Sequence, residues 1–401
     1  MMELNLKVGN DNGNSEHDII INGYQIQQPN VYAKVRKLPM LDEINPNYVA
    51  ENIEKNLIVT LDSKLATGIY FIGEYALKNG EKVRSIEVGV DNDKINSEIV
   101  YVNTLAQIAG YAAKELYMKD NSFADKDVIA KVSMTTALPI KQYNKKGAEE
   151  FANKFMEDKH KLTVHVGDIR VNVEVIFEYV KVIPEGVTAI HAVQNISKDK
   201  LKDFKIKKFA DKETIEDIKD VEYFKNKKIL HIGIGEGTTE LPITTDIEFN
   251  PNYIKGINNG IGHAIDRALE EFKNDLGLLN YTRQKYSEVI KDKQHKFYPV
   301  ASDIVEGYIE EEAEEILHAA KGEIQKANNE VDIILVYGGG SIPMRSQLEP
   351  KIQEICKKGN IDLVYVPEKY AVVLESMGLY NFTNGKIFNF LREKYLNSKV
   401  D

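Results

Sequence analysis

The sequence predicts an α/β protein built from two similar halves. Its 401 residues exceed the size of one typical domain and suit two. Residues 5–21 and 228–245 each read as a strand, a turn rich in glycine or acidic residues, and a second strand. Each half also has a later buried strand that ends in small residues and a proline, at 128–139 and 331–343. This recurrence indicates two halves built alike.

Composition and charge restrict the classes of function. Hydrophobic residues make up 43% and charged residues 28%, which is typical of soluble globular proteins. The net charge of −10 argues against broad electrostatic affinity for nucleic acid or anionic membranes. The single cysteine excludes an internal disulfide framework, and no signal peptide or membrane-spanning run is visible. We therefore expect a cytoplasmic protein without direct nucleic-acid or membrane partners.

The first half is expected to alternate strands and amphipathic helices. Apolar residues recur on one face of a helix predicted at 97–118. A charged helix is expected at 147–158, and residues 36–95 read as irregular and polar, with two strand-like patches at 56–61 and 68–72. The predicted strands of this half are 4–8, 18–22, 24–34, 128–134, 163–166, 170–175 and 177–183.

The second half repeats this alternation. Its lysine- and acid-rich run at 197–228 is interpreted as a surface insertion, because such runs usually form solvated faces. Strands are expected at 229–232, 239–245, 331–337 and 363–366. Helices are expected at 188–194, 256–276, 303–328 and 384–397.

The turn between the two strands of 228–245 contains more glycine than a hairpin needs. Gly233, Gly235 and Gly237 leave backbone N–H groups uncovered, so an anion can approach them closely. The alternative is a bulged hairpin without a ligand. The chain has no G-x-x-x-x-G-K-[ST] motif, and the glycines lead into a strand rather than a helix, which excludes a dinucleotide-binding βαβ unit.

The order of the motifs resembles the actin/Hsp70/sugar-kinase ATPase superfamily over nearly the whole chain. Two phosphate hairpins are followed by strand 331–337 and a glycine triplet. The resemblance implies an actin-like α/β fold of two similar domains with a nucleotide cleft between them. The first would span 1–183, with a small subdomain at about 36–95, and the second 184–383, with one at about 256–330. The helix at about 384–397 would pack back on the first domain.

The resemblance also implies a site for ATP, with GTP left open, and Mg²⁺. Asp11 would be a catalytic residue that holds the metal through water, and phosphate contacts would come from Asn12, Gly13, Asn14 and Ser15. The second phosphate loop would consist of Gly235, Glu236, Gly237, Thr238 and Thr239.

One position departs from the family pattern. An aspartate usually stands two residues before the first loop glycine, whereas this chain has Gly233. The second carboxylate on the metal side is therefore in question. Glu236 either replaces it or holds the ribose.

Further roles follow from the same resemblance. Glu185 stands where a glutamate would orient the attacking water, although a glutamate after a proline is also typical of a solvated helix cap. The adenosine would contact Gly338, Gly339, Gly340 and Ser341. Polar candidates on the helix that covers the base are His263, Asp266 and Arg267.

Within the superfamily, the chain looks most similar to bacterial plasmid-segregation actins of the ParM type. Residues 70–77, Pro139 and Pro184-Glu185-Gly186 carry this likeness. It implies an ATPase that polymerises with ATP and Mg²⁺, disassembles after hydrolysis and drives plasmid DNA segregation. The expected partners are further copies of the chain and a DNA-bound adaptor of the ParR type. A non-hydrolysing nucleotide-binding subunit and a small-metabolite kinase are the alternatives.

Overall fold

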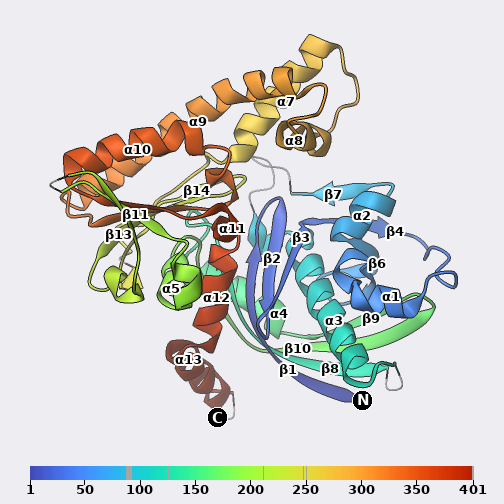
Figure 1. Cartoon of the computed structure of the whole chain (residues 1–401). Coiled ribbons are helices and arrows are strands. Elements are labelled where there is room, and N and C mark those ends of the chain that lie inside the picture. Colours follow the sequence, from blue (N-terminus) through green and yellow to red (C-terminus); the bar gives the residue numbers. More distant parts are fainter. Residues whose placement is uncertain (87–92, 124–125, 211, 247, 250, 400–401) are drawn as a thin grey trace. The chain divides into compact units, whose positions relative to one another are not determined.

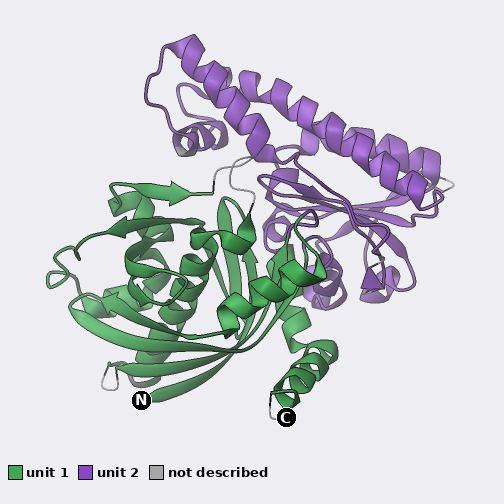
Figure 2. Cartoon of the chain, turned by 180° about the vertical axis from the view of Figure 1, so that it is seen from behind, with its two compact units in different colours: residues 1–138, 142–184, 375–401 green, residues 139–141, 185–374 purple. Residues whose placement is uncertain are grey.

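The computed structural model describes residues 1–86, 93–123, 126–210, 212–246, 248–249 and 251–399. The chain divides into two compact units (Figure 2). The first unit comprises 1–138, 142–184 and 375–401, and the second comprises 139–141 and 185–374. The chain thus leaves the first unit after Pro184 and returns to it at Glu375. The sequence alone predicts this return at the helix expected at about 384–397. In the described ranges, no helix combines the length and apolarity needed to cross a membrane.

A ten-stranded sheet forms the first unit, in the order β3-β2-β1-β8-β10-β9-β5-β6-β4-β7 (Figure 1). The hairpin β1–β2 is antiparallel, whereas β1, β8 and β10 run parallel. The strands are β1 (Met2–Asn12), β2 (Glu16–Ile21), β3 (Tyr24–Pro29), β4 (Val31–Val35), β5 (Ile58–Asp62), β6 (Thr67–Ile72), β7 (Val83–Ser85), β8 (Asp127–Leu138), β9 (Lys159–Val166) and β10 (Ile169–Pro184).

The central helix of the first unit, α3 (Glu98–Asp120), is more deeply buried than its predicted single apolar face implies. It contacts β1, β8, β9 and β10 as well as α1 (Pro46–Glu51) and the short helix η1 (Ile53–Lys55). The strand-like patches predicted at 56–61 and 68–72 correspond to β5 and β6, and α2 (Gly73–Asn79) follows β6. Helix α4 (Lys145–Met156) packs on β10.

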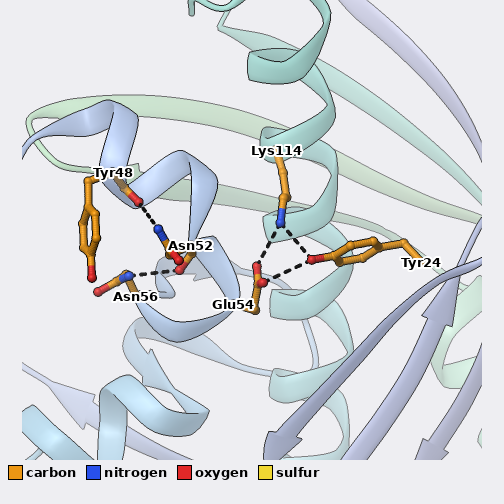
Figure 3. A network of polar contacts seen from close by, with 6 residues as sticks. All are labelled: Tyr24, Tyr48, Asn52, Glu54, Asn56 and Lys114. Atoms are coloured by element: carbon orange, nitrogen blue, oxygen red, sulfur yellow. Dashed lines mark hydrogen bonds and ion pairs between the residues drawn. The ribbon is translucent and has the colours of Figure 1, made fainter.

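A polar network fastens η1 to α3 in this unit (Figure 3). Lys114 of α3 donates to the Tyr24 hydroxyl of β3 at 2.9 Å and to Glu54 of η1 at 3.3 Å. The Tyr24 hydroxyl in turn donates to Glu54 at 3.1 Å, and the Lys114 ammonium lies 4.7 Å from the centre of the Tyr24 ring. Three elements that are distant in sequence therefore share one charge-assisted cluster.

The last helices complete the first unit. Helix α12 (Leu374–Asn384) crosses β1, because Gly9 leaves room for the backbone of Ser376 and Tyr380. Helix α13 (Lys386–Asn397) follows and packs Phe388 against Tyr179 of β10, with ring centres 5.2 Å apart.

A nine-stranded sheet forms the second unit, with the main order β12-β11-β19-β18-β13-β14-β17. Strand β13 is parallel to β18 and antiparallel to β14 and β15. The strands are β11 (Lys205–Lys208), β12 (Thr214–Asp217), β13 (Lys228–Ile234), β14 (Thr239–Glu240), β15 (Ile243–Thr245), β16 (Glu248–Phe249), β17 (Gly256–Ile257), β18 (Ile333–Tyr337) and β19 (Asp362–Tyr365).

In the second unit, α9 (Tyr298–Lys326) packs against both α7 (Ile261–Leu276) and α10 (Arg345–Gly359) (Figure 1). Predicted helix 256–276 begins only at Ile261, because residues 256–257 pair with β14 as a strand. Predicted helix 303–328 begins earlier, at Tyr298, with Pro299 in its first turn. Between α7 and α9 lies α8 (Arg283–Lys291).

The run at 197–228 is not a simple surface insertion. It contains α6 (Lys198–Leu201), the short helix η3 (Val221–Phe224) and the hairpin β11–β12, which extends the sheet beyond β19. Phe204 and Phe224 are fully buried and anchor the run despite its charge. Helix α5 (Ala189–Gln194) precedes it.

Candidate nucleotide-binding site

The first predicted phosphate loop is the turn between β1 and β2. Asp11 pairs in register with Asp18, and Asn12 pairs with His17. Alternate residues of β1 face α3, so the Asn12 side chain turns inward and donates to the carbonyl of Val100 at 3.4 Å. Asp11 lies on the opposite face and is partly exposed. A Cβ at Gly13 would lie 2.8 Å from the carbonyl oxygen of Glu16, so the turn requires glycine there.

A buried amide network holds this loop from behind. Asn30 donates to the side-chain oxygen of Asn12 at 2.6 Å and to the Gly13 carbonyl at 2.5 Å, and Asn103 donates to Asn30 at 2.6 Å. The backbone N–H of Asn30 also donates to the Ser15 carbonyl. Because the Asn12 side chain is committed to the interior, a phosphate contact from this residue would come from its backbone. The sequence analysis missed Asn30 and Asn103, since isolated asparagines carry no motif.

The second loop joins β13 to β14 and is closed by a hydrogen bond from the Gly235 N–H to the Thr238 carbonyl at 2.9 Å. The first N–H groups of α7 donate to this loop, Ile261 to Gly235 at 3.2 Å and Gly262 to Glu236 at 2.8 Å. The imidazole Nε2 of His263 lies 3.0 Å from the Gly237 carbonyl oxygen. The Thr239 hydroxyl donates to the Asn259 carbonyl at 2.5 Å. The loop and the start of α7 therefore form one unit.

Glycines allow these backbones to approach closely. A Cβ at Gly260 would lie 2.3 Å from the Glu236 carbonyl oxygen. Gly338 has a φ of +93°, and a Cβ there would lie 2.2 Å from the Ile234 carbonyl oxygen. A Cβ at Gly340 would lie 2.9 Å from the Gly235 carbonyl oxygen. The glycine triplet, the second loop and the start of α7, which are distant in sequence, thus converge within one unit.

The other residues of the adenosine motif support this turn. The Ser341 hydroxyl is buried and donates to the Gly338 carbonyl at 2.7 Å. Tyr365 donates to the Ser341 carbonyl at 2.6 Å. Ser341 therefore stabilises the turn, and the backbone around Gly339 forms its surface.

The polar candidates on α7 separate into two groups. Arg267 faces α9, where it pairs with Glu311 at 2.5 Å and lies 4.4 Å from the centre of the Tyr308 ring. Asp266 faces the loop side and lies 2.6 Å from the guanidinium of Arg283, the first residue of α8. Burial raises the pKa of Asp266, although Arg283 acts in the opposite direction.

Arg283 also forms a close ion pair with Glu236 of the second loop. One guanidinium therefore bridges the loop and α7, and the Glu236 carboxylate already has a cationic partner. Sequence analysis missed Arg283, because it lies in a stretch without a recognisable pattern. Both roles predicted for Glu236, at the metal or at the ribose, therefore concern a carboxylate that is paired with Arg283.

Tyr337 explains the glycine at position 233. The two residues pair in register on β13 and β18, and a Cβ at Gly233 would lie 3.1 Å from two ring carbons and the hydroxyl oxygen of Tyr337. The Tyr337 hydroxyl donates to the Gly186 carbonyl at 2.8 Å. The ring therefore occupies the space that a side chain at 233 would need.

Glu185 follows the last residue of β10 and is half-buried. Gly186 has a φ of +82° and lies against Pro242, which fixes the backbone beside Glu185. The N-cap position of α5 is Thr188, so Glu185 is not the cap residue of that helix.

A metal ion at the site would depend on few protein ligands. Across the described ranges, no group of three or more His, Cys, Asp or Glu side chains could hold a metal. The partly exposed carboxylate of Asp11 fits Mg²⁺, which binds one or two carboxylates together with phosphate and water oxygens.

The fold and these loops define an actin-like protein. Residues 9–187 match the family described as actin-like proteins, N-terminal domain. This match marks residues 9–187 as an actin-like N-terminal domain, and the chain has the actin-like fold that the ordered motifs predicted. No curated protein sequence matches it.

Among solved structures, the actin-like protein Alp7A has a TM-score of 0.68 and 17% identity, with 99% of this chain and 100% of Alp7A covered. ParM of Bacillus thuringiensis with ATP has a TM-score of 0.59 and 18% identity, covering 96% of this chain and 99% of that one. An archaeal actin homologue has a TM-score of 0.63 and 14% identity, with 96% of this chain and 99% of the homologue covered.

Proposed function

We propose that the chain is an ATPase that assembles into filaments with ATP and Mg²⁺. The observation that carries the proposal is the convergence in the second unit of the loop 235–239, the start of α7 and the glycine triplet 338–340. Backbone N–H groups in such a cradle suit phosphate oxygens. Structures of Bacillus thuringiensis ParM with ATP, ADP and AMPPNP support nucleotide binding, and GTP remains an alternative nucleotide.

The roles of the residues follow from this proposal. Gly13, Asn14 and Ser15 in the first loop and Gly237 and Thr238 in the second bind phosphate through their backbones, while the Gly235 N–H closes the second loop on Thr238. Asp11 holds Mg²⁺, which neutralises phosphate charge when bound. Glu185 orients the attacking water. Asp266 and Arg283 hold α7 and α8 beside the second loop.

The filament and its use form the second part of the proposal. A similar solved structure is described as a non-polymerisable quadruple mutant of pCBH ParM, with a TM-score of 0.65, which supports polymerisation by a protein of this fold. We infer a cytoplasmic homopolymer that drives plasmid DNA segregation through a DNA-bound adaptor of the ParR type. The net charge of −10 favours an adaptor over direct contact with DNA.

A nucleotide-binding subunit with very slow hydrolysis is the second candidate. Position 233 carries no carboxylate because it is a glycine packed against Tyr337, and Arg283 binds the carboxylate of Glu236. The second loop therefore offers no free carboxylate to a metal or to water. Hydrolysis then depends on Asp11 and Glu185.

Light scattering and phosphate release, recorded together, test the proposal. Adding ATP and Mg²⁺ should raise scattering above a critical concentration, with phosphate release following. Asp11→Ala should reduce nucleotide affinity or turnover by at least about tenfold, roughly 1.4 kcal/mol, because the metal loses its carboxylate. Scattering without phosphate release would favour the second candidate. Turnover without scattering would favour a kinase, and normal turnover in Asp11→Ala would mean that the first loop is only a turn.

A further inference from the structure

Two carboxylates of the first unit face each other across the β1–β2 hairpin. Asp11 and Asp18 are direct partners in the antiparallel register, so both side chains lie on the same face of the sheet. The Cβ atoms of such partners are about 4.5–5.5 Å apart. Next to this pair the face is covered, because Gly9 lies against the backbone of α12 and Ile20 is buried.

Asp18 is buried without a balancing cation. It is 3% exposed, and its Oδ1 atom has no hydrogen-bond partner. Asp11 and Glu16, its acidic neighbours on the same face of the hairpin, cannot balance its charge. A buried carboxylate needs a proton, an ion pair or a metal, because its desolvation is costly.

We propose that Asp11 and Asp18 together form a divalent-cation site within the first unit, with Asp18 as a direct ligand. Asp11 is partly exposed and gives the ion an approach from solvent, whereas Asp18 supplies an oxygen from the covered side. Mg²⁺ suits this pair, because it commonly takes one or two carboxylates and keeps several waters. The site needs no nucleotide, so it goes beyond the function proposed above and can be tested separately.

Electron paramagnetic resonance of Mn²⁺ tests this site in the full-length, nucleotide-free chain. Wild type should bind Mn²⁺ saturably at one site, and excess Mg²⁺ should release it. Asp18→Asn should weaken binding by at least about tenfold, since even the loss of an outer-shell group typically costs about 10- to 100-fold in affinity. Glu16→Gln is the matched control, because it removes the same charge from an exposed position two residues away on β2.

Each Mn²⁺-binding result either supports or overturns the assignment of Asp18 as a ligand. Retention of wild-type affinity in Asp18→Asn, or an equal loss in Glu16→Gln, would show that Asp18 is not a ligand. Absence of saturable Mn²⁺ binding to wild type would overturn the proposal. If Asp18→Asn does not fold, Asp11→Asn changes the more exposed partner and should also lose Mn²⁺, and unchanged binding there would overturn the proposal.

Discussion

At the scale of single residues, Tyr337 and Arg283 limit the carboxylates that the second loop can offer to a ligand. Tyr337 fills the space at position 233, and Arg283 pairs with the only acidic residue of the loop, Glu236. The carboxylates proposed above to hold a divalent cation, Asp11 and Asp18, both lie on the first unit. The second loop thus has Gly233 where the family has an aspartate, and the β1–β2 hairpin has an additional carboxylate at Asp18.

Glu185→Gln tests the residue proposed to orient the attacking water. The change keeps the size of the side chain and removes its capacity as a base, so ATP-induced scattering should persist while phosphate release slows by about 10²- to 10⁴-fold. Because hydrolysis is proposed to precede disassembly, the filaments should also outlive those of wild type. Glu213→Gln, on an exposed residue paired with Lys357, is a matched control and should behave as wild type.

At the scale of elements, the sequence predicts most strands and helices but not how they combine. Apolar spacing locates β13, β18 and α3, since burial imposes a period on the side chains. The same reasoning reads residues 197–228 as an insertion, because the pairing of β11 with β19 depends on a partner far along the chain. Glycine patterns indicate both phosphate loops, whereas Asn30, Arg283 and Tyr337 become visible only through contacts that no local pattern encodes.

Lys114→Met tests the network that joins β3, η1 and α3 (Figure 3). Lys114 and Glu54 are 15% and 20% exposed, so their interactions are less screened than those of a surface pair. Losing the ammonium should lower the free energy of unfolding by about 1–2 kcal/mol in urea denaturation, because Glu54 and Tyr24 lose a charged partner. Lys78→Met removes the exposed pair with Glu74 and should cost only about 0.3–0.5 kcal/mol. Equal costs would mean that the network contributes no more than a surface ion pair.

At the scale of the whole molecule, each unit has its own sheet and core and also buries neutral histidines. Burial lowers the pKa of His231 in the second unit to about 3, and that of His165 in the first unit to about 4. His191 of α5 likewise has a pKa of about 4 because of its burial. His231 and His165 make hydrogen bonds to Thr244 and Thr60, at 2.9 and 2.8 Å. Both units therefore depend on histidines that remain uncharged.

This dependence predicts that the fold weakens in mild acid. A histidine with a lowered pKa in the folded state binds a proton more readily when unfolded, so its contribution to stability is complete above pH 6.5 and is lost as the pH falls toward the folded value. For His231, the loss between pH 6.5 and pH 5 should be about 2 kcal/mol, at roughly 1.4 kcal/mol per pH unit. That is a large part of a typical unfolding free energy of about 5–15 kcal/mol.

Urea unfolding of wild type and His231→Gln at pH 7, 6 and 5 measures this effect. The variant loses some stability at every pH, because the imidazole packing and its bond to Thr244 are gone. The difference between the two proteins should nevertheless shrink by about 2 kcal/mol from pH 7 to pH 5, since glutamine has no proton to gain. The comparison cancels all other titrating groups. His318→Gln, at an exposed position of α9, should leave the pH dependence of wild type unchanged. A constant difference between wild type and His231→Gln would mean that the His231 ring can take up a proton inside the folded chain.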